Sequence, residues 1–150
     1  MTEKQLHTRE SFRNFQTITT RWMDNDVYGH VNNVTYYSWF DTAVNRFMIE
    51  AGGLDIHRSS VIAYVVSSSC NYFRPIAYPE NVEVGIRIER LGNSSVRYVL
   101  GIFRANEESI CAQGEFVHVF VDRNTEKSCP MPQEIRTALA ELVVQDAQAE

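Results

Sequence analysis

The stretch RWMDNDVYGHVNNVTYYSWFDTAVNRFMIEAGG, residues 21–53, decides the fold of this chain. Its second part predicts one long helix over residues 33–51, because apolar side chains recur there at intervals of three and four residues, as on one face of a helix. Gly52-Gly53 would end this helix, since glycine adopts the left-handed conformation at little cost. The apolar face consists of Tyr36, Tyr37, Phe40, Val44, Phe47, Met48 and Ala51.

The sequence on either side of this helix predicts strands. Residues 15–22 are rich in β-forming side chains. Residues 61–66 form a continuous apolar run, which is expected of a central strand covered on both faces. Period-two alternation or long apolar runs then predict strands over residues 82–89, 95–104 and 110–121, and a second helix near residues 132–145 follows Pro130 and Pro132.

One long helix set against consecutive antiparallel hairpins indicates an α+β fold. The sheet must curve around the helix in order to bury its aromatic face. A chain of 150 residues suits a single domain. We therefore expect one domain over residues 1–150, with residues 1–13 as a flexible N-terminal arm and the second helix as a C-terminal addition.

The composition argues against several classes of protein. Lys and Arg number 14 against 19 Asp and Glu, a net charge of −5, and no basic run interrupts this balance, so nucleic acid is not an expected partner. No apolar stretch approaches the roughly 18 residues that span a bilayer, so we expect no membrane partner. Cys70, Cys111 and Cys129 are odd in number, far apart and without metal-ligand spacing. We therefore expect free thiols, no metal site and a cytoplasmic location.

The first part of the deciding stretch differs from the scaffold around it. Two aspartates, a glycine, a histidine and paired asparagines crowd the approach to the predicted helix. Unpaired N–H groups at a helix start can stabilise a carbonyl oxygen that acquires negative charge. A nearby carboxylate can activate water or attack directly. The combination suits hydrolysis of an acyl compound, with Asp26 as the candidate carboxylate and Asp24 as a residue that fixes the loop through hydrogen bonds.

The residues from Asp24 to Asn33, DNDVYGHVNN, together with Tyr36, resemble the signature of the 4-hydroxybenzoyl-CoA thioesterase family of hotdog-fold proteins. The HVNN portion is also similar to the plant acyl-ACP thioesterases of the same superfamily. The segments NYFRP at residues 71–75 and RLGNSS at residues 90–95 stand at spacings like those of the family. The resemblance covers residues 15–122.

This resemblance implies a curved antiparallel sheet wrapped around one central helix, with chains paired edge to edge and the active site at the dimer interface. It implies that Asp26 is the catalytic base or nucleophile. The amide that polarises the thioester carbonyl would lie at or next to Asn33. His30 matches the histidine of the acyl-ACP branch. We expect at least a homodimer, with a tetramer or hexamer left open, and no cofactor apart from the CoA or phosphopantetheine of the substrate.

Candidate substrate contacts follow from the same comparison. Tyr28 stands where the acyl-ACP enzymes commonly have asparagine, and Tyr36 could line the substrate pocket, although its spacing fits the helix core as well. Arg74, Arg90 and Arg97 are either ordinary solvated charges or phosphate contacts for a CoA or carrier-protein arm. The family's cluster of basic residues for CoA phosphates has no counterpart here.

The sequence therefore predicts hydrolysis of an acyl thioester, with acyl-CoA as the leading substrate. Three alternatives stay open: an acyl-ACP thioesterase, a module that binds acyl thioesters without turnover, and dehydration of a hydroxyacyl thioester. The last has the least support, because the histidine–acid motif of that reaction is not found.

Overall fold

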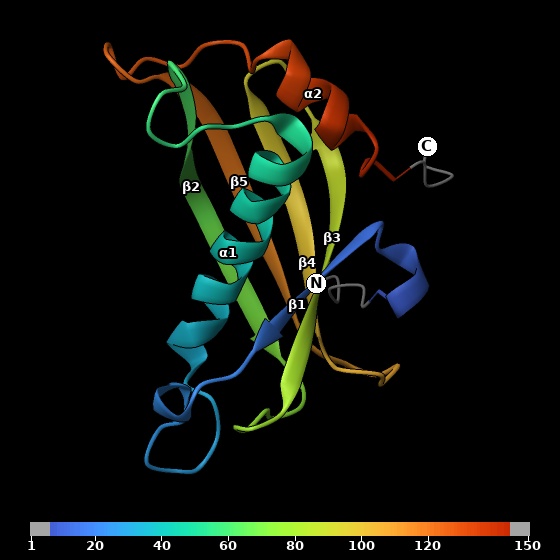
Figure 1. Cartoon of the computed structure of the whole chain (residues 1–150). Helices are drawn as coiled ribbons and strands as arrows, with labels where there is room; N and C mark the ends of the chain where they lie inside the picture. The colour runs from blue at the N-terminus through green and yellow to red at the C-terminus, as the bar shows by residue number, and fades with distance from the viewer. Residues whose placement is uncertain (1–6, 145–150) are drawn as a thin grey trace, which may run out of the picture.

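A computed structural model describes residues 7–144 (Figure 1). Five strands form one antiparallel sheet in the order β1-β3-β4-β5-β2, and one long helix lies in its hollow. The elements in chain order are β1 (Asn14–Thr19), α1 (Asn33–Gly52), β2 (Val61–Tyr72), β3 (Asn81–Leu91), β4 (Ser95–Arg104), β5 (Ile110–Asp122) and α2 (Gln133–Ala140).

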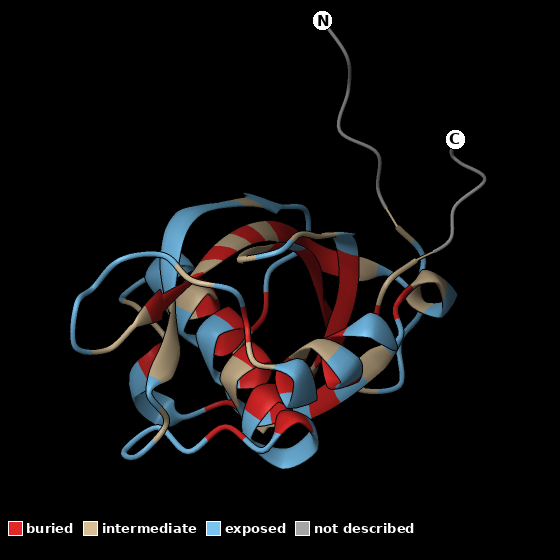
Figure 2. Cartoon of the chain, turned by 90° about the horizontal axis from the view of Figure 1, so that it is seen from above, coloured by how far each residue is buried: buried red, intermediate tan, exposed pale blue. Residues whose placement is uncertain are grey.

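The helix α1 forms as its sequence predicts. The side chain of Asn32 caps its start by accepting a hydrogen bond from the Val34 N–H, and Gly53 ends it in the left-handed conformation, with φ of 71°. Figure 2 shows the buried side of the helix turned toward the sheet that curves around it. The buried helix residues are Tyr36, Trp39, Phe40, Ala43, Val44, Phe47, Met48 and Gly52. This arrangement is the hotdog fold that the sequence predicts.

Two element boundaries differ from the expected ones. The first strand ends at Thr19 rather than at residue 22, because the chain turns sharply at Trp22–Asp24. The Asp24 carboxylate fixes that turn by accepting a hydrogen bond from the Arg21 main-chain N–H at 2.8 Å. The C-terminal helix ends at Ala140 rather than near residue 145, which lies outside the described residues.

The position expected for residues 61–66 was wrong. The strand β2 lies at an edge of the sheet and pairs only with β5, so it is not a central strand covered on both faces. Tyr64, Val65 and Val66 are 43%, 43% and 59% exposed. An apolar run of this length predicts a strand, but it does not determine where in the sheet the strand lies. Within the described residues, the outer edge of β2 leaves its main-chain groups without a neighbouring strand.

The start of the described chain packs on the convex side of the sheet. Phe12 is buried there between the register partners Gly85 and Gly101 and the ring of Phe103. A Cβ atom on Gly101 would lie 2.7 Å from Phe12 Cζ, so the bare backbone makes room for this ring. Residues 7–13 of the expected flexible arm are therefore packed, and residues 1–6 lie outside the described residues. No helix between residues 7 and 144 is long and apolar enough to cross a membrane.

Candidate active site

The loop before α1 folds into a tight turn that carries Asp26 and His30. The Asp26 N–H donates to the His30 carbonyl at 2.9 Å, and the Gly29 N–H donates to the Asp26 carbonyl at 3.0 Å. Gly29 has φ of 89°, a left-handed conformation that favours glycine. The sequence D-x-x-G-H thus closes on itself and presents both side chains on one side of the loop.

The two aspartates of this loop have different surroundings. Asp24 is buried and holds Arg21, accepting hydrogen bonds from its main-chain N–H and from two guanidinium nitrogens. Asp26 is half-buried, and its carboxylate accepts one bond, from the Tyr28 main-chain N–H at 2.9 Å. Within the described residues Asp26 has no ion-pair partner. Asp24 is therefore committed to the loop, as expected, whereas an oxygen of Asp26 is available for chemistry.

The first residue of α1 offers a main-chain donor. The Val34 N–H is used by the Asn32 side chain, and the Thr35 N–H donates to the Asn32 carbonyl at 2.9 Å. The Asn33 N–H has no acceptor within residues 7–144, and Asn33 lines the cavity beside Asp26. The asparagine that caps the helix is Asn32, so Asn33 is left with the amide that can bind an oxyanion.

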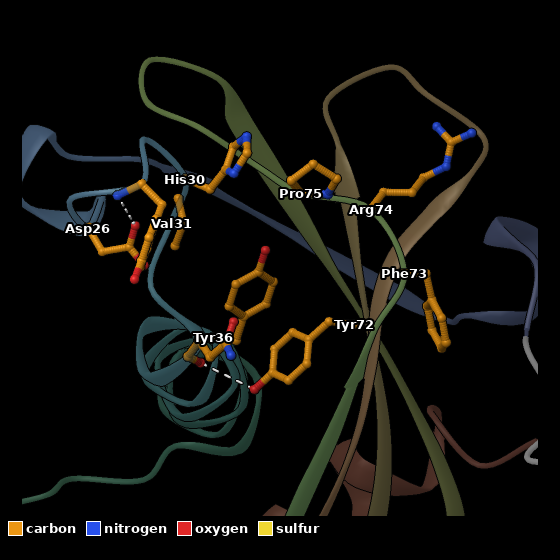
Figure 3. Close-up of a pocket in the computed structure, with 10 residues that line it drawn as sticks. Asp26, His30, Val31, Tyr36, Tyr72, Phe73, Arg74 and Pro75 are labelled. Atoms are coloured by element: carbon orange, nitrogen blue, oxygen red, sulfur yellow. Dashed lines mark hydrogen bonds between the residues drawn. The ribbon is translucent and has the colours of Figure 1, made fainter.

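These groups meet at a cavity of about 370 Å³. Figure 3 shows Asp26, His30 and Val31 on one side, the segment from Tyr72 to Pro75 on the other, and Tyr36 between them above the start of α1. The lining residues are Asp26, Tyr28, His30, Val31, Asn33, Tyr36, Tyr72, Phe73, Arg74 and Pro75. The loop before α1 and the segment that follows β2, far apart in the sequence, thus line the same pocket.

Hydrogen bonds to and from the main chain hold the two sides of this pocket in place. The Val31 N–H donates to the Ile76 carbonyl at 2.7 Å, and the Tyr78 N–H donates to the Asn25 side chain at 3.1 Å. Arg104 of β4 supports the second side by donating to the Pro75 carbonyl at 2.6 Å. The separation of Asp26 from the opposite wall is therefore fixed by contacts on both sides of the cavity.

Tyrosines form the floor of the pocket. Tyr36 is only 3% exposed, and its ring contacts those of Trp39 and Tyr72, each with centroids 5.0 Å apart. Burial raises the pKa of Tyr36 well above its ordinary value, so its hydroxyl remains a neutral donor. Tyr36 therefore belongs to the core and also lines the cavity.

The structure separates the three candidate arginines. Arg74 lines the pocket. Arg90 and Arg97 face one another in the register of β3 and β4, and Arg97 forms an ion pair with Glu115 at 3.0 Å. The residues level with Arg97 on the neighbouring strands are Val117 and Ser67, whereas the pocket lies at Tyr72, five positions further along β2. Within one chain neither arginine reaches the cavity.

The other residues that line the cavity were only partly expected from the sequence. Tyr28 lines the cavity and is 85% exposed. The sequence did not single out four lining residues, Val31, Tyr72, Phe73 and Pro75, although the last three stand in the NYFRP segment that carries part of the resemblance. Between residues 7 and 144, no three His, Cys, Asp or Glu side chains gather as metal ligands would.

The fold and this pocket define a hotdog protein with a carboxylate beside a free helix-start amide. The family model of the thioesterase-like superfamily matches residues 20–139, and the chain belongs to this family. Membership and the thioesterases among its structural neighbours support acyl-thioester hydrolysis as its activity. The match is to the superfamily as a whole and does not select the narrower 4-hydroxybenzoyl-CoA thioesterase family.

Individual relatives agree with this placement. The PA5185 protein from Pseudomonas aeruginosa strain PAO1 is 57% identical, with a TM-score of 0.91 over 94% of this chain and 98% of its own. A predicted thioesterase from Bacillus stearothermophilus is 29% identical, with a TM-score of 0.73 over 86% of this chain and 95% of its own. Slr0204, a 1,4-dihydroxy-2-naphthoyl-CoA thioesterase from Synechocystis, shares the fold at 17% identity, with a TM-score of 0.76 over 91% of this chain and 98% of its own.

Proposed function

We propose that this protein hydrolyses acyl-CoA thioesters and that Asp26 carries the reaction. The observation that carries the proposal is that a carboxylate at Asp26 and an N–H at Asn33 meet at one cavity, where within residues 7–144 the carboxylate has no ion-pair partner and the N–H has no acceptor. A thioester needs both groups, because its carbonyl oxygen gains negative charge while a nucleophile attacks its carbon.

In the proposed reaction the thioester carbonyl oxygen accepts a hydrogen bond from the Asn33 N–H. Asp26 takes a proton from a water molecule as the water oxygen bonds to the carbonyl carbon. The carbon–sulfur bond then breaks, and the departing thiolate takes this proton from Asp26, which regenerates the carboxylate and leaves a free acid and a thiol. In the second route, Asp26 itself attacks, releases the thiolate and forms a mixed anhydride that water hydrolyses. Both routes need the same carboxylate.

The other pocket residues are proposed as substrate contacts. His30 lies on the same turn as Asp26 and is proposed as a catalytic residue that hydrogen-bonds to the substrate beside the thioester carbonyl. Tyr28 and Tyr36 would contact the acyl group or the pantetheine arm. Arg74 would contact a phosphate of that arm, since a guanidinium suits phosphate geometry. Arg90 and Arg97 could take this role only toward a substrate that extends well beyond the cavity of one chain.

We also propose that the protein works as a homodimer in the cytoplasm, joined at the free edge of β2. The exposed apolar side chains of Tyr64, Val65 and Val66 support this, because a long apolar edge strand readily pairs with another chain. Sedimentation at micromolar concentration tests it. A monomer would contradict the proposal, and a tetramer or hexamer would extend it.

The test of the reaction is thiol release from short-chain, long-chain and aromatic acyl-CoAs by the wild type and by Asp26→Asn. We expect a loss of about two to four orders of magnitude in Asp26→Asn, as for removal of a general base. Asp41→Asn is the matched control, since Asp41 is an exposed aspartate on α1 outside the cavity. Wild-type turnover in a folded Asp26→Asn protein would exclude the proposed mechanism.

A carrier-protein substrate is the second candidate, because Arg74 is the only arginine that lines the described cavity and the CoA phosphates have no basic cluster there. Thiol release from an acyl-carrier protein but from no acyl-CoA would establish it. If a thioester raised the melting temperature without any thiol release, the protein would instead be a binding module.

A further inference from the structure

Tyr72 is the last residue of β2 and contacts the start of α1. Its register partner on β5 is Ala112, a buried residue of the helix-facing core, so the Tyr72 side chain projects toward the helix. Its hydroxyl donates a hydrogen bond to the Asn33 carbonyl at 3.3 Å. Figure 3 shows this bond reaching from the strand end to the first turn of the helix.

The bond acts on a peptide group that is held at both ends. The peptide between Asn33 and Val34 has its carbonyl bonded by Tyr72 and its N–H bonded by the Asn32 side chain. The preceding peptide has its carbonyl, that of Asn32, bonded by the Thr35 N–H. Its own N–H, that of Asn33, has no acceptor within the described residues. The groups on both sides of this N–H are therefore hydrogen-bonded, and the bond to the Asn33 carbonyl comes from Tyr72, outside the helix.

A ring contact adds to this bond. The Tyr72 and Tyr36 rings meet edge to face, with an interplanar angle of 88°. Tyr36 lies one turn after Asn33 and is buried, so Tyr72 touches both the first and the second turn of α1. At 3.3 Å the hydroxyl bond is long for O–H···O, and the ring contact adds to its hold on the helix start.

We propose that Tyr72 is a positioning residue, which aims the Asn33 N–H at the thioester oxygen through its hydrogen bond to the Asn33 carbonyl. The inference rests on the proposed function, since it assigns the Asn33 N–H to the oxyanion. The oxygen needs this donor most when its negative charge has developed. Loss of the Tyr72 hydroxyl therefore lowers kcat while KM changes little.

The test compares kcat and KM for the best acyl-CoA in the wild type, Tyr72→Phe and Tyr98→Phe. Tyr98 is a matched control, because it also faces the core but lies outside the cavity, and its hydroxyl has no hydrogen-bond partner within residues 7–144. We expect Tyr72→Phe to lower kcat about tenfold, less than the loss of a whole oxyanion donor, with KM within about twofold of the wild type. Tyr98→Phe should match the wild type.

A double variant separates positioning from general loosening of the fold. Asn32→Ala removes the bond at the other end of the same peptide, so its effect on kcat and that of Tyr72→Phe should combine to less than their product. Amide NMR supplies a readout without turnover: the Asn33 and Val34 N–H signals should shift in Tyr72→Phe and not in Tyr98→Phe.

The outcomes distinguish the two proposals. An unchanged kcat in Tyr72→Phe, a change in KM alone, an equal loss in Tyr98→Phe or unmoved Asn33 and Val34 signals would each overturn the role of Tyr72 while Asp26→Asn still defined the reaction. Wild-type activity in Asp26→Asn would overturn the proposed function instead, and the NMR comparison would still report whether Tyr72 orients this peptide.

Discussion

The ring of Phe40 on α1 occupies the space that a side chain on Gly114 of β5 would need. A Cβ atom at Gly114 would lie 2.6 Å from Phe40 Cζ and 3.0 Å from the Ser69 carbonyl oxygen. The aromatic face of the helix therefore approaches the sheet where the sheet has no side chain. The contact between Phe40 and Gly114 thus fixes the position of α1 on the sheet just beyond the pocket.

Gly114→Ala should consequently lower the free energy of unfolding by about 1–3 kcal/mol through overpacking. Urea unfolding measures the change. The double variant Phe40→Leu with Gly114→Ala should recover part of the loss relative to the sum of the two single changes, because the smaller side chain gives back the space. Strict additivity would show that Phe40 is not the obstacle.

Gly29→Ala should damage the Asp26 turn by a different route. Nothing lies within 4 Å of a Cβ atom built on Gly29, but its φ of 89° is unfavourable for alanine. We expect a loss of about 1 kcal/mol in stability and slower thiol release, since the turn relaxes and carries Asp26 with it. Gly29→Asn should retain more activity than Gly29→Ala, because asparagine tolerates the left-handed region better. Equal activity in the two variants would contradict this explanation.

Tyr98→Phe should leave the protein as stable as the wild type or stabilise it by about 1 kcal/mol. The Tyr98 hydroxyl is fully buried and has no hydrogen-bond partner within residues 7–144. Removing it abolishes a desolvated polar group and keeps the ring. Tyr98→Ala, by contrast, should cost about 3–5 kcal/mol through the cavity it leaves. A marked loss in Tyr98→Phe, measured by calorimetry, would mean that the hydroxyl makes a stabilising contact.

His118 should make the protein less stable as the pH falls from about 6.5 to 4. The side chain is buried against the rings of Tyr98 and Phe116, and burial lowers its pKa from 6.5 to about 4. Between these values the unfolded chain binds a proton that the folded chain excludes, so the free energy of unfolding declines as acid is added. The full effect is about 3 kcal/mol.

Urea unfolding at pH 7, 5.5 and 4.5 measures this dependence. His118→Leu should show a shallower decline than the wild type, whereas a variant of the exposed His57, His57→Gln, should keep the wild-type slope. Parallel declines in the wild type and His118→Leu would assign the pH dependence to other groups.

The long elements could be predicted from the sequence because their periodicity records local geometry. The spacing of Tyr36, Phe40, Val44 and Phe47 repeats as a helix repeats, and the alternation through Val82 and Val84 repeats as a strand repeats. The order of strands in the sheet is not local. The apolar run at residues 61–66 predicted a strand correctly. Its expected central position was wrong, because a run of apolar residues does not determine which strands pair with it.

The site was predictable only in part for a similar reason. The turn from Asp26 to His30 closes through bonds between residues adjacent in sequence, so its pattern is visible in the chain. The opposite wall comes from the end of β2, 39 residues beyond Asn33 in the case of Tyr72. Pairing of β2 with β5 brings that wall to the pocket, and no short-range spacing encodes such a pairing.

The strand β2 has one free edge and also ends in the pocket wall. Side chains keep their faces when a strand slides by two residues, so such a shift would preserve the core pattern and yet carry Tyr72 past Asn33. The pairing of β2 with β5 therefore sets where Tyr72 lies against Asn33. If the protein dimerises at the free edge of β2, as proposed above, the same twelve-residue strand takes part in both the dimer contact and the pocket wall, so a substitution that changes one of them also bears on the other.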